Sequence, residues 1–277
     1  MASNAYSTAP PSYSAAPPSY EGTQNVPLLD APHGSLPPRS ETDGVADSDL
    51  PDDFKYSTSV SQCSISVRHA FVRKVYTILT AQLLMTGGLS TLFILNSSVR
   101  NWVQRHPSMM WISLFGSIAL LVLTFWKRKS YPINMFFLTG FTLLEGYSVA
   151  TITTFYNTKI VAEALLITLI VFVGLTLFAM QTKYDFMGWI PFLGCALWIL
   201  LGFGLISAFF PYSSFGEMLY GGLGALIFSA YVLIDTQLIM KHYHPEEEIA
   251  ASISLYLDFI NLFLSILRIL NSSQNNN

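Results

Sequence analysis

Seven long apolar runs dominate this sequence, and they constrain its fold more than any other feature. Each run is long enough to cross a hydrocarbon core of about 30 Å as a helix that rises about 1.5 Å per residue. The connections between the runs are short and polar. The sequence therefore predicts an all-α integral membrane protein, a compact bundle of seven transmembrane helices without a large extramembrane domain. The runs cover approximately residues 75–95, 109–126, 132–155, 160–180, 187–210, 216–240 and 249–270.

The composition excludes an ordinary soluble protein. Of the 277 residues, 52% are hydrophobic and 11% are charged, whereas about 25% of the residues of a typical soluble domain are charged. A soluble globule cannot bury that much apolar surface. The two cysteines, Cys63 and Cys195, have the spacing of neither a disulfide framework nor a zinc site. We therefore expect no cofactor and no enzymatic activity.

The first 60 residues differ from the rest of the chain. They are rich in Pro, Ser, Ala and Tyr, and they contain eight acidic and two basic residues. Without apolar periodicity, such a segment cannot bury enough surface to offset the entropy of ordering. We interpret residues 1–60 as a disordered cytosolic tail, residues 61–270 as the membrane domain and residues 271–277 as a polar C-terminal tail.

A short motif occurs twice within the N-terminal tail. A Pro-Pro-x-Tyr segment in the polyproline II conformation is the form that WW-type aromatic grooves bind. The two copies indicate partner-binding sites for WW-domain proteins, although chance repetition in low-complexity sequence is the alternative. The motif residues are Pro10, Pro11 and Tyr13 in the first copy, and Pro17, Pro18 and Tyr20 in the second.

Lysine and arginine are distributed unevenly over the loops. Ten of them lie on the side of the N-terminal tail and four on the other side. Because positive charges concentrate in cytosolic loops, we expect the N-terminus to be cytosolic. Seven crossings then place the C-terminus on the lumenal or outer side.

Five acidic residues lie within the apolar runs, and ionisable groups inside a membrane usually mark a functional site. Asp258 lies about 13 Å into the seventh run and Asp235 about 8 Å from the end of the sixth. Both carboxyl groups are thus expected in the cytosolic half of an antiparallel helix pair, where they could meet. Glu145 lies about 20 Å into the third run, too deep for an interfacial residue. Glu163 and Glu217 lie near the outer ends of the fourth and sixth runs.

The seventh run also carries a polar stripe along one face. The stripe consists of Ser254, Asp258, Asn261, Ser265 and Arg268, at spacings of four, three, four and three residues. Such a stripe should face the bundle interior, so we expect the last helix to be central. The candidate residues of an ion path are Glu145, Asn261, Ser265, Glu217 and Glu163, and Arg268 is a candidate latch.

Two segments of the last apolar runs resemble a known signature. Residues 231–240, YVLIDTQLIM, and 254–264, SLYLDFINLFL, closely resemble the signature of the transmembrane Bax-inhibitor-motif family. Residues 71–76, 141–146 and 181–185 also match, and the resemblance covers about residues 65–270. The Pro- and Tyr-rich tail is similar to that of the lifeguard branch, and the whole chain to a fungal or other lower-eukaryotic member.

This resemblance implies a fold and a function. The implied fold is the seven-helix bundle of Bax-inhibitor type with a central last helix. The implied function is a calcium leak in endoplasmic reticulum, Golgi or vacuolar membranes, with an anti-apoptotic or stress-protective role and Bcl-2-type cell-death regulators as partners. Asp235 and Asp258 match an aspartate pair that acts as a pH-sensitive gate in bacterial relatives and would bind calcium transiently. The second helix lacks the acid of the family pattern, for which Glu145 is the substitute.

Other functional classes stay open at this point. An intramembrane aspartyl protease also needs two aspartates on adjacent helices, but its Gly-x-Gly-Asp motif is absent here. A seven-helix receptor is a poor fit for two reasons. The N-terminus is expected to be cytosolic, and no lysine lies in the middle of a helix to form a Schiff base with retinal. A membrane adaptor that acts through partner binding without transport is consistent with the two tail motifs.

Overall fold

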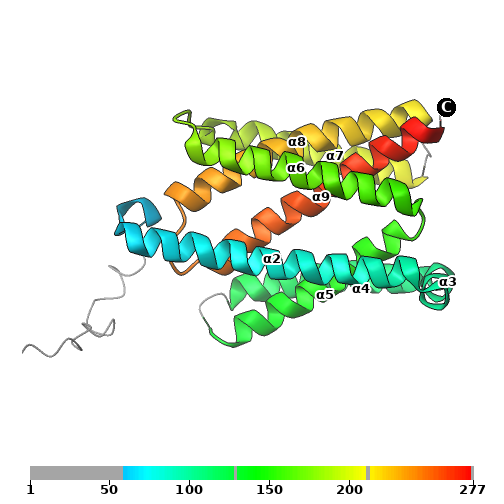
Figure 1. Cartoon of the computed structure of the whole chain (residues 1–277), viewed down its shortest axis with the longest axis horizontal. Coiled ribbons are helices and arrows are strands. Elements are labelled where there is room, and N and C mark those ends of the chain that lie inside the picture. The colour runs from blue at the N-terminus through cyan, green and yellow to red at the C-terminus, as the bar shows by residue number, and fades with distance from the viewer. Residues whose placement is uncertain (1–58, 128–129, 210–212, 276–277) are drawn as a thin grey trace, which may run out of the picture. The chain divides into compact units, whose positions relative to one another are not determined.

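The computed structural model describes residues 59–127, 130–209 and 213–275. These residues form eight α-helices and two single 3₁₀ turns, and no strand occurs among them (Figure 1). The turns are η1 (Val60–Gln62) and η2 (Met187–Trp189). The helices are α2 (Ile65–Leu95), α3 (Ser97–Arg105), α4 (Pro107–Trp126), α5 (Ile133–Thr153), α6 (Thr158–Gln181), α7 (Ile190–Phe209), α8 (Ser214–Lys241) and α9 (Glu248–Asn275).

Seven of these helices are long and apolar enough to cross a membrane, which confirms the predicted all-α bundle. They run between two ends of the bundle. We call the end where α2 and α9 begin the tail-side end, and the opposite one the far end. The α2 helix begins ten residues before the expected position 75, because its first turns are polar and hydropathy detects only the apolar part. For the same reason, α9 continues to Asn275 through a polar last turn.

The α3 helix is short, and the sequence analysis did not predict it. It lies at the far end, between the first two membrane-spanning helices. Asn96 caps it, because its side-chain oxygen accepts hydrogen bonds from the backbone N–H groups of Ser98 (3.1 Å) and Val99 (3.2 Å). Val103 anchors the helix in an apolar cluster with Phe93 of α2 and Ala150 of α5. Because α3 has only nine residues and many of them are polar, a search for long apolar runs does not detect it.

Local sequence signals start the other helices at the far end. The Asn157 side chain accepts a hydrogen bond of 2.9 Å from the backbone N–H of Lys159 and so caps α6. Ser213 does the same for α8, accepting from the backbone N–H of Gly216 at 3.3 Å. Pro107 occupies the first turn of α4, where its missing N–H costs nothing.

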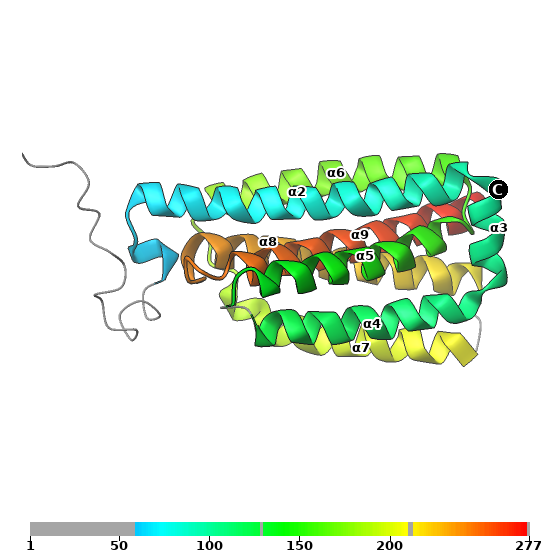
Figure 2. The same ribbon diagram turned by 90° about the horizontal axis from the view of Figure 1, so that it is seen from below.

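The last helix, α9, is the centre of the bundle, as predicted. It packs against α8, α2, α6 and α5, and Figure 2 shows it running between them. Its most apolar 18-residue window is 56% buried, the largest share among the seven spans, whereas that of α7 is 11% buried. Within the polar stripe of α9, Asp258 is buried, whereas the other four residues are partly exposed.

The most extensive helix contact among the described residues is that between α8 and α9, and two glycines make close packing possible there. A Cβ atom at Gly221 would lie 2.9 Å from the backbone oxygen of Ser265, and one at Gly224 would lie 2.6 Å from the Ser265 hydroxyl. Side chains at these two positions would push the helices apart. Both glycines therefore serve the packing of α8 on α9.

Tyr256 of α9 forms the middle of the core. Its side chain is fully buried, its hydroxyl is hydrogen-bonded to that of Thr86 in α2 at 2.9 Å, and its ring meets Phe141 of α5 edge to face at 5.9 Å. Two neighbouring helices, α2 and α5, are thus tied to one residue of the central helix. Phe259 makes a similar ring contact with Phe172 of α6 at 5.3 Å.

Candidate functional site

The two aspartates of the predicted pair meet inside the bundle. Asp258 is 6% exposed and Asp235 is partly buried, and a side-chain hydrogen bond joins them. Asp235 lies about 9 Å from the end of α8 and Asp258 about 15 Å from the start of α9. A hydrogen bond between two carboxyl groups requires that one of them carries a proton. The structure therefore brings the two acidic side chains together in the tail-side half of the bundle.

A chain of hydroxyl groups connects this pair to the tail-side surface. Ser254, one turn before Asp258, is hydrogen-bonded to the Asp235 side chain. Its hydroxyl also lies 3.3 Å from that of Tyr243, in the connection between α8 and α9. Burial raises the pKa of Tyr243 to about 12, so this phenol stays protonated at physiological pH. Tyr243 therefore does not change its charge near neutral pH.

The η1 turn covers this connection. The Val60 backbone N–H donates a hydrogen bond of 2.9 Å to the Tyr243 carbonyl oxygen. The Val60 side chain is fully buried in the main apolar cluster, against which Tyr243 also packs. Contacts thus run without interruption from Val60 through Tyr243 and Ser254 to the aspartates.

Gln237 fixes the neighbouring part of α8. Its amide oxygen accepts a hydrogen bond of 3.0 Å from the Phe186 backbone N–H, and its amide nitrogen donates one of 2.7 Å to the Tyr184 carbonyl. The side chain is fully buried, so both amide groups are satisfied inside the protein. The connection between α6 and α7 is therefore attached to α8 two residues from Asp235.

Glu145 belongs to a different helix pair. The Ser117 hydroxyl of α4 donates a hydrogen bond of 2.9 Å to one Glu145 carboxyl oxygen. Next to it, the hydroxyl groups of Ser113 and Ser148 also join α4 to α5. Among the described residues, no hydrogen bond or ion pair links Glu145 to Asp235 or Asp258. The structure thus places Glu145 in the interior, as its depth predicts, but apart from the aspartate pair.

Arg268, the candidate latch, lies in a cluster at the far end. Its guanidinium group lies over the ring of Tyr220 in α8, 4.6 Å from the ring centroid. It is also hydrogen-bonded to Tyr156 in the connection between α5 and α6, where Glu217 contributes a nearby negative charge. Burial raises the pKa of Tyr156, and the Arg268 charge opposes part of that rise. Arg268 is about 15 Å along α9 from Asp258 and so is not part of the pair.

The remaining candidates for an ion path satisfy their polar groups locally. Asn261 donates a hydrogen bond of 2.8 Å to the Leu257 carbonyl, and Ser265 donates one of 2.7 Å to the Asn261 carbonyl, both within α9. Glu163 forms an ion pair with Lys159 one turn earlier in α6, at 3.7 Å. Asn261 and Ser265 are partly exposed, and the Ser265 hydroxyl faces Gly224 of α8, whereas Glu163 lies at the far-end surface.

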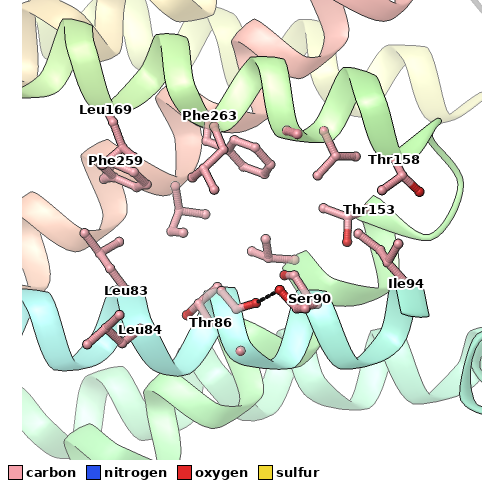
Figure 3. Close-up of a pocket in the computed structure, with 18 of the residues that line it drawn as sticks. Leu83, Leu84, Thr86, Ser90, Ile94, Thr153, Thr158, Leu169, Phe259 and Phe263 are labelled. Atoms are coloured by element: carbon pink, nitrogen blue, oxygen red, sulfur yellow. Dashed lines mark hydrogen bonds between the residues drawn. The ribbon is translucent and has the colours of Figure 1, made fainter. Parts of the chain in front are cut away.

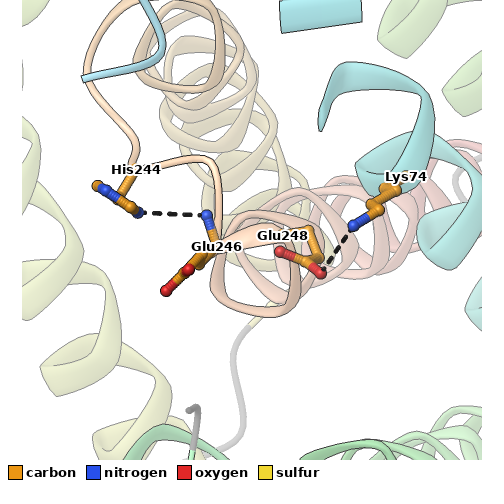
Figure 4. A network of polar contacts seen from close by, with 4 residues as sticks. All are labelled: Lys74, His244, Glu246 and Glu248. Atoms are coloured by element: carbon orange, nitrogen blue, oxygen red, sulfur yellow. Dashed lines mark hydrogen bonds and ion pairs between the residues drawn. The ribbon is translucent and has the colours of Figure 1, made fainter. Parts of the chain in front are cut away.

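Polar residues also connect α2 to the start of α9 (Figure 4). The Lys74 ammonium group lies 3.7 Å from a Glu248 carboxyl oxygen, and the Glu246 backbone N–H donates to the His244 ring at 3.3 Å. Within the described residues, no group of three or more His, Cys, Asp or Glu side chains is arranged to hold a metal ion. A calcium ion at the aspartate pair would need hydroxyl, carbonyl or water oxygens to complete its coordination.

Four residues of this site were not singled out from the sequence. Gln237, Tyr243 and Val60 are positioned by contacts between distant segments, and Ser117 is an ordinary serine in a membrane helix. Gln237 and Tyr256 both lie inside the quoted signature segments, which is the sequence signal that could have found them. The Pro-Pro-x-Tyr motifs lie outside the described residues.

Comparison with known proteins places this geometry in a family. Residues 68–275 match the family model described as "Inhibitor of apoptosis-promoting Bax1". The chain is 46% identical over 225 residues to Bax inhibitor 1 of Schizosaccharomyces pombe, covering 81% of this chain and 85% of that protein.

Two further relatives are similar over nearly their whole length. Protein lifeguard 4 of Mus musculus is 39% identical over 83% of this chain and 97% of its own. The Golgi anti-apoptotic protein of Vaccinia virus is 38% identical over 82% of this chain and 95% of its own. The matched residues 68–275 extend over the seven membrane-spanning helices, from the first turn of α2 onward.

Proposed function

Because the chain belongs to the Bax inhibitor family, we propose that it is a calcium leak channel of an intracellular membrane, gated by pH through Asp235 and Asp258. We further propose that it has an anti-apoptotic or stress-protective role, and the name of the Vaccinia virus relative, Golgi anti-apoptotic protein, supports the anti-apoptotic part. The names of the relatives describe anti-apoptotic membrane proteins and not enzymes, so we infer a non-catalytic role with calcium as the transported ion.

The hydrogen bond between Asp235 and Asp258 is the observation that carries the proposal. Two adjacent carboxyl groups in a poorly solvated interior cannot both ionise without a large cost. Their protons therefore leave in two steps that belong to the pair. While one proton is shared, the pair holds α8 against α9; when both groups are ionised, their repulsion favours separation of the helices. The leak should therefore rise as pH increases through the second step of the pair.

Calcium flux from liposomes that contain only the purified protein tests this function. We expect flux that increases with pH across a series from acidic to mildly alkaline. Absence of flux at every pH would instead support the second candidate, a membrane adaptor that regulates cell death through partners such as Bcl-2-type proteins.

The η1 turn acts as a cover over the tail-side end of the pair in this mechanism. Val60→Asp places a charge at a fully buried position, which is so costly that η1 should detach from Tyr243. We expect the leak at acidic pH to rise by roughly fivefold, which corresponds to about 1 kcal/mol of lost closed-state stability. Ser61→Asp, at the exposed neighbouring position, is the matched control and should leave the leak unchanged; equal leaks in both variants would contradict the covering role.

The N-terminal tail is proposed to bind WW-domain proteins through its two Pro-Pro-x-Tyr copies. We expect Tyr13→Ala combined with Tyr20→Ala to abolish binding of a purified WW domain, because the aromatic groove loses its tyrosine in both copies. Calcium flux should stay at the wild-type level, since the tail has no membrane-spanning segment. Unchanged WW binding in the double variant would refute the motif interpretation.

We propose that the protein resides in endoplasmic reticulum, Golgi or vacuolar membranes with its N-terminus in the cytosol. The excess of Lys and Arg on the tail side supports this orientation. Protease treatment of sealed microsomes should remove an epitope tag placed at Ala2. Protection of the tag would reverse the orientation and place the aspartate pair near the lumenal side.

A further inference from the structure

A cavity unrelated to the aspartate pair lies between α2 and α6 (Figure 3). Its volume is about 570 Å³, within the usual range for sites that bind small molecules. Phe259, Ile260 and Phe263 of α9 form its floor. At about 100° per residue, these side chains project from the side of α9 opposite Asp258. The cavity is therefore separate from the proposed ion path.

The cavity exists because α2 and α6 are held apart. Both helices pack on the central helix α9, but they are not among the described helix pairs in extensive contact with each other. Gly87 and Gly88 line the α2 side, and a Cβ atom at either position would meet nothing within 4 Å. Glycines here leave space that no side chain of the described protein fills.

The wall of this cavity is almost entirely apolar. Leu84 of α2 and Leu165 and Leu169 of α6 line it and are 71%, 41% and 39% exposed. An ordered water molecule needs two to four polar partners, which such a wall does not supply. At this depth in a membrane-spanning bundle, the surrounding medium is hydrocarbon. The occupant must therefore be apolar along most of its length.

The two ends of the cavity differ in polarity. Ser90, Thr153 and Thr158 lie at the far end, whereas Leu83, Leu169 and Phe259 lie deeper in the membrane (Figure 3). Thr158, at the start of α6, is exposed and offers its hydroxyl group to a head group, whereas Thr153 is fully buried. This polarity gradient matches a lipid whose head group lies at the membrane surface and whose chain points inward.

The dimensions select one hydrocarbon chain. The α2 residues that line the cavity extend from Thr80 to Leu95, about 22 Å along the helix. Spread over about 22 Å, the volume of about 570 Å³ corresponds to a groove about 6 Å wide. A helix with its side chains is about 10–12 Å across and does not fit, whereas an unbranched chain with carbon contacts of about 4 Å does.

We propose that this cavity is a binding site for one acyl chain of a phospholipid from the membrane leaflet at the far end. The chain lies between α2 and α6 on the floor formed by α9, and the head group lies beside Thr158. The bound chain replaces the direct contact that α2 and α6 lack and stabilises their positions on the central helix.

Photolabelling of the full-length protein tests this site. The protein is reconstituted into phosphatidylcholine bilayers that contain a phosphatidylcholine with a diazirine in one acyl chain, and labelled residues are identified by mass spectrometry. We expect labelling of Leu83, Leu169 and Phe259 above that of the lipid-facing surface of α7. Gly87→Phe, which fills the groove, should abolish this excess labelling.

Gly174→Phe is the matched control, because Gly174 is also an exposed helical glycine with nothing within 4 Å of its Cβ position but does not line the cavity. This variant should retain the wild-type labelling. If Gly87→Phe fails to fold, Gly88→Leu fills less space and serves in its place. Three results would each overturn the proposal. The first is labelling that Gly87→Phe does not reduce, and the second is labelling no stronger than that of α7. The third is displacement of the label by a sterol but not by phosphatidylcholine.

Discussion

Asp235→Asn and Asp258→Asn are each expected to remove the pH dependence of the calcium leak. Asparagine keeps the size and a hydrogen bond but cannot ionise, so neither variant can develop repulsion between α8 and α9. At about 4 Å and an effective dielectric constant of about 20, that repulsion is worth about 4 kcal/mol. We therefore expect both single variants to keep the low leak of the acidic state at every pH, measured as calcium flux from liposomes.

The double variant and a surface control sharpen this prediction. Because the two residues act as one unit, Asp235→Asn combined with Asp258→Asn should add little to either single change. Asp185→Asn makes the same chemical change at an exposed residue that caps η2 through the Met187 N–H, and it should leave the pH profile intact. Wild-type pH dependence in both single variants would place the sensor elsewhere, with Glu145 the next residue to test.

Tyr256→Ala is expected to cause the largest loss of stability of any single truncation in the core. The change removes a fully buried ring, its contact with Phe141 and its hydrogen bond to Thr86. The cavity left behind should lower the free energy of unfolding by about 3 kcal/mol. Tyr256→Phe removes only the hydroxyl group and should cost about 0.6 kcal/mol, the typical value for a hydrogen bond between membrane helices.

Reversible unfolding in mixed detergent micelles measures both changes. Phe192→Ala in α7, where the side chain is 77% exposed, is the control for loss of an aromatic ring and should change the free energy of unfolding by less than about 0.5 kcal/mol. Equal destabilisation by Tyr256→Ala and Phe192→Ala would mean that Tyr256 does not hold the bundle together.

The sequence alone determined the number of crossings, the helical class and the central position of α9. These features follow from local composition, because an apolar run of about 20 residues in a membrane must be helical to satisfy its backbone. The stripe from Ser254 to Arg268 predicted an interior face for α9, since exposure of five polar residues to lipid is unfavourable. The depths of Asp235 and Asp258 along adjacent antiparallel helices predicted that the two could meet.

Only the tertiary structure decided which polar groups are partners. The stripe does not reveal that Arg268 binds Tyr156 and Tyr220 at the far end, or that Ser117 is the partner of Glu145. The two residues of each pair are 28 to 112 positions apart in the sequence. Which residues become partners depends on the rotation and tilt of each helix, and no local sequence pattern determines these. The same is true of the cover formed by Val60 and of the proposed lipid groove beside Gly87. Both depend on the distances between the helices that pack around α9.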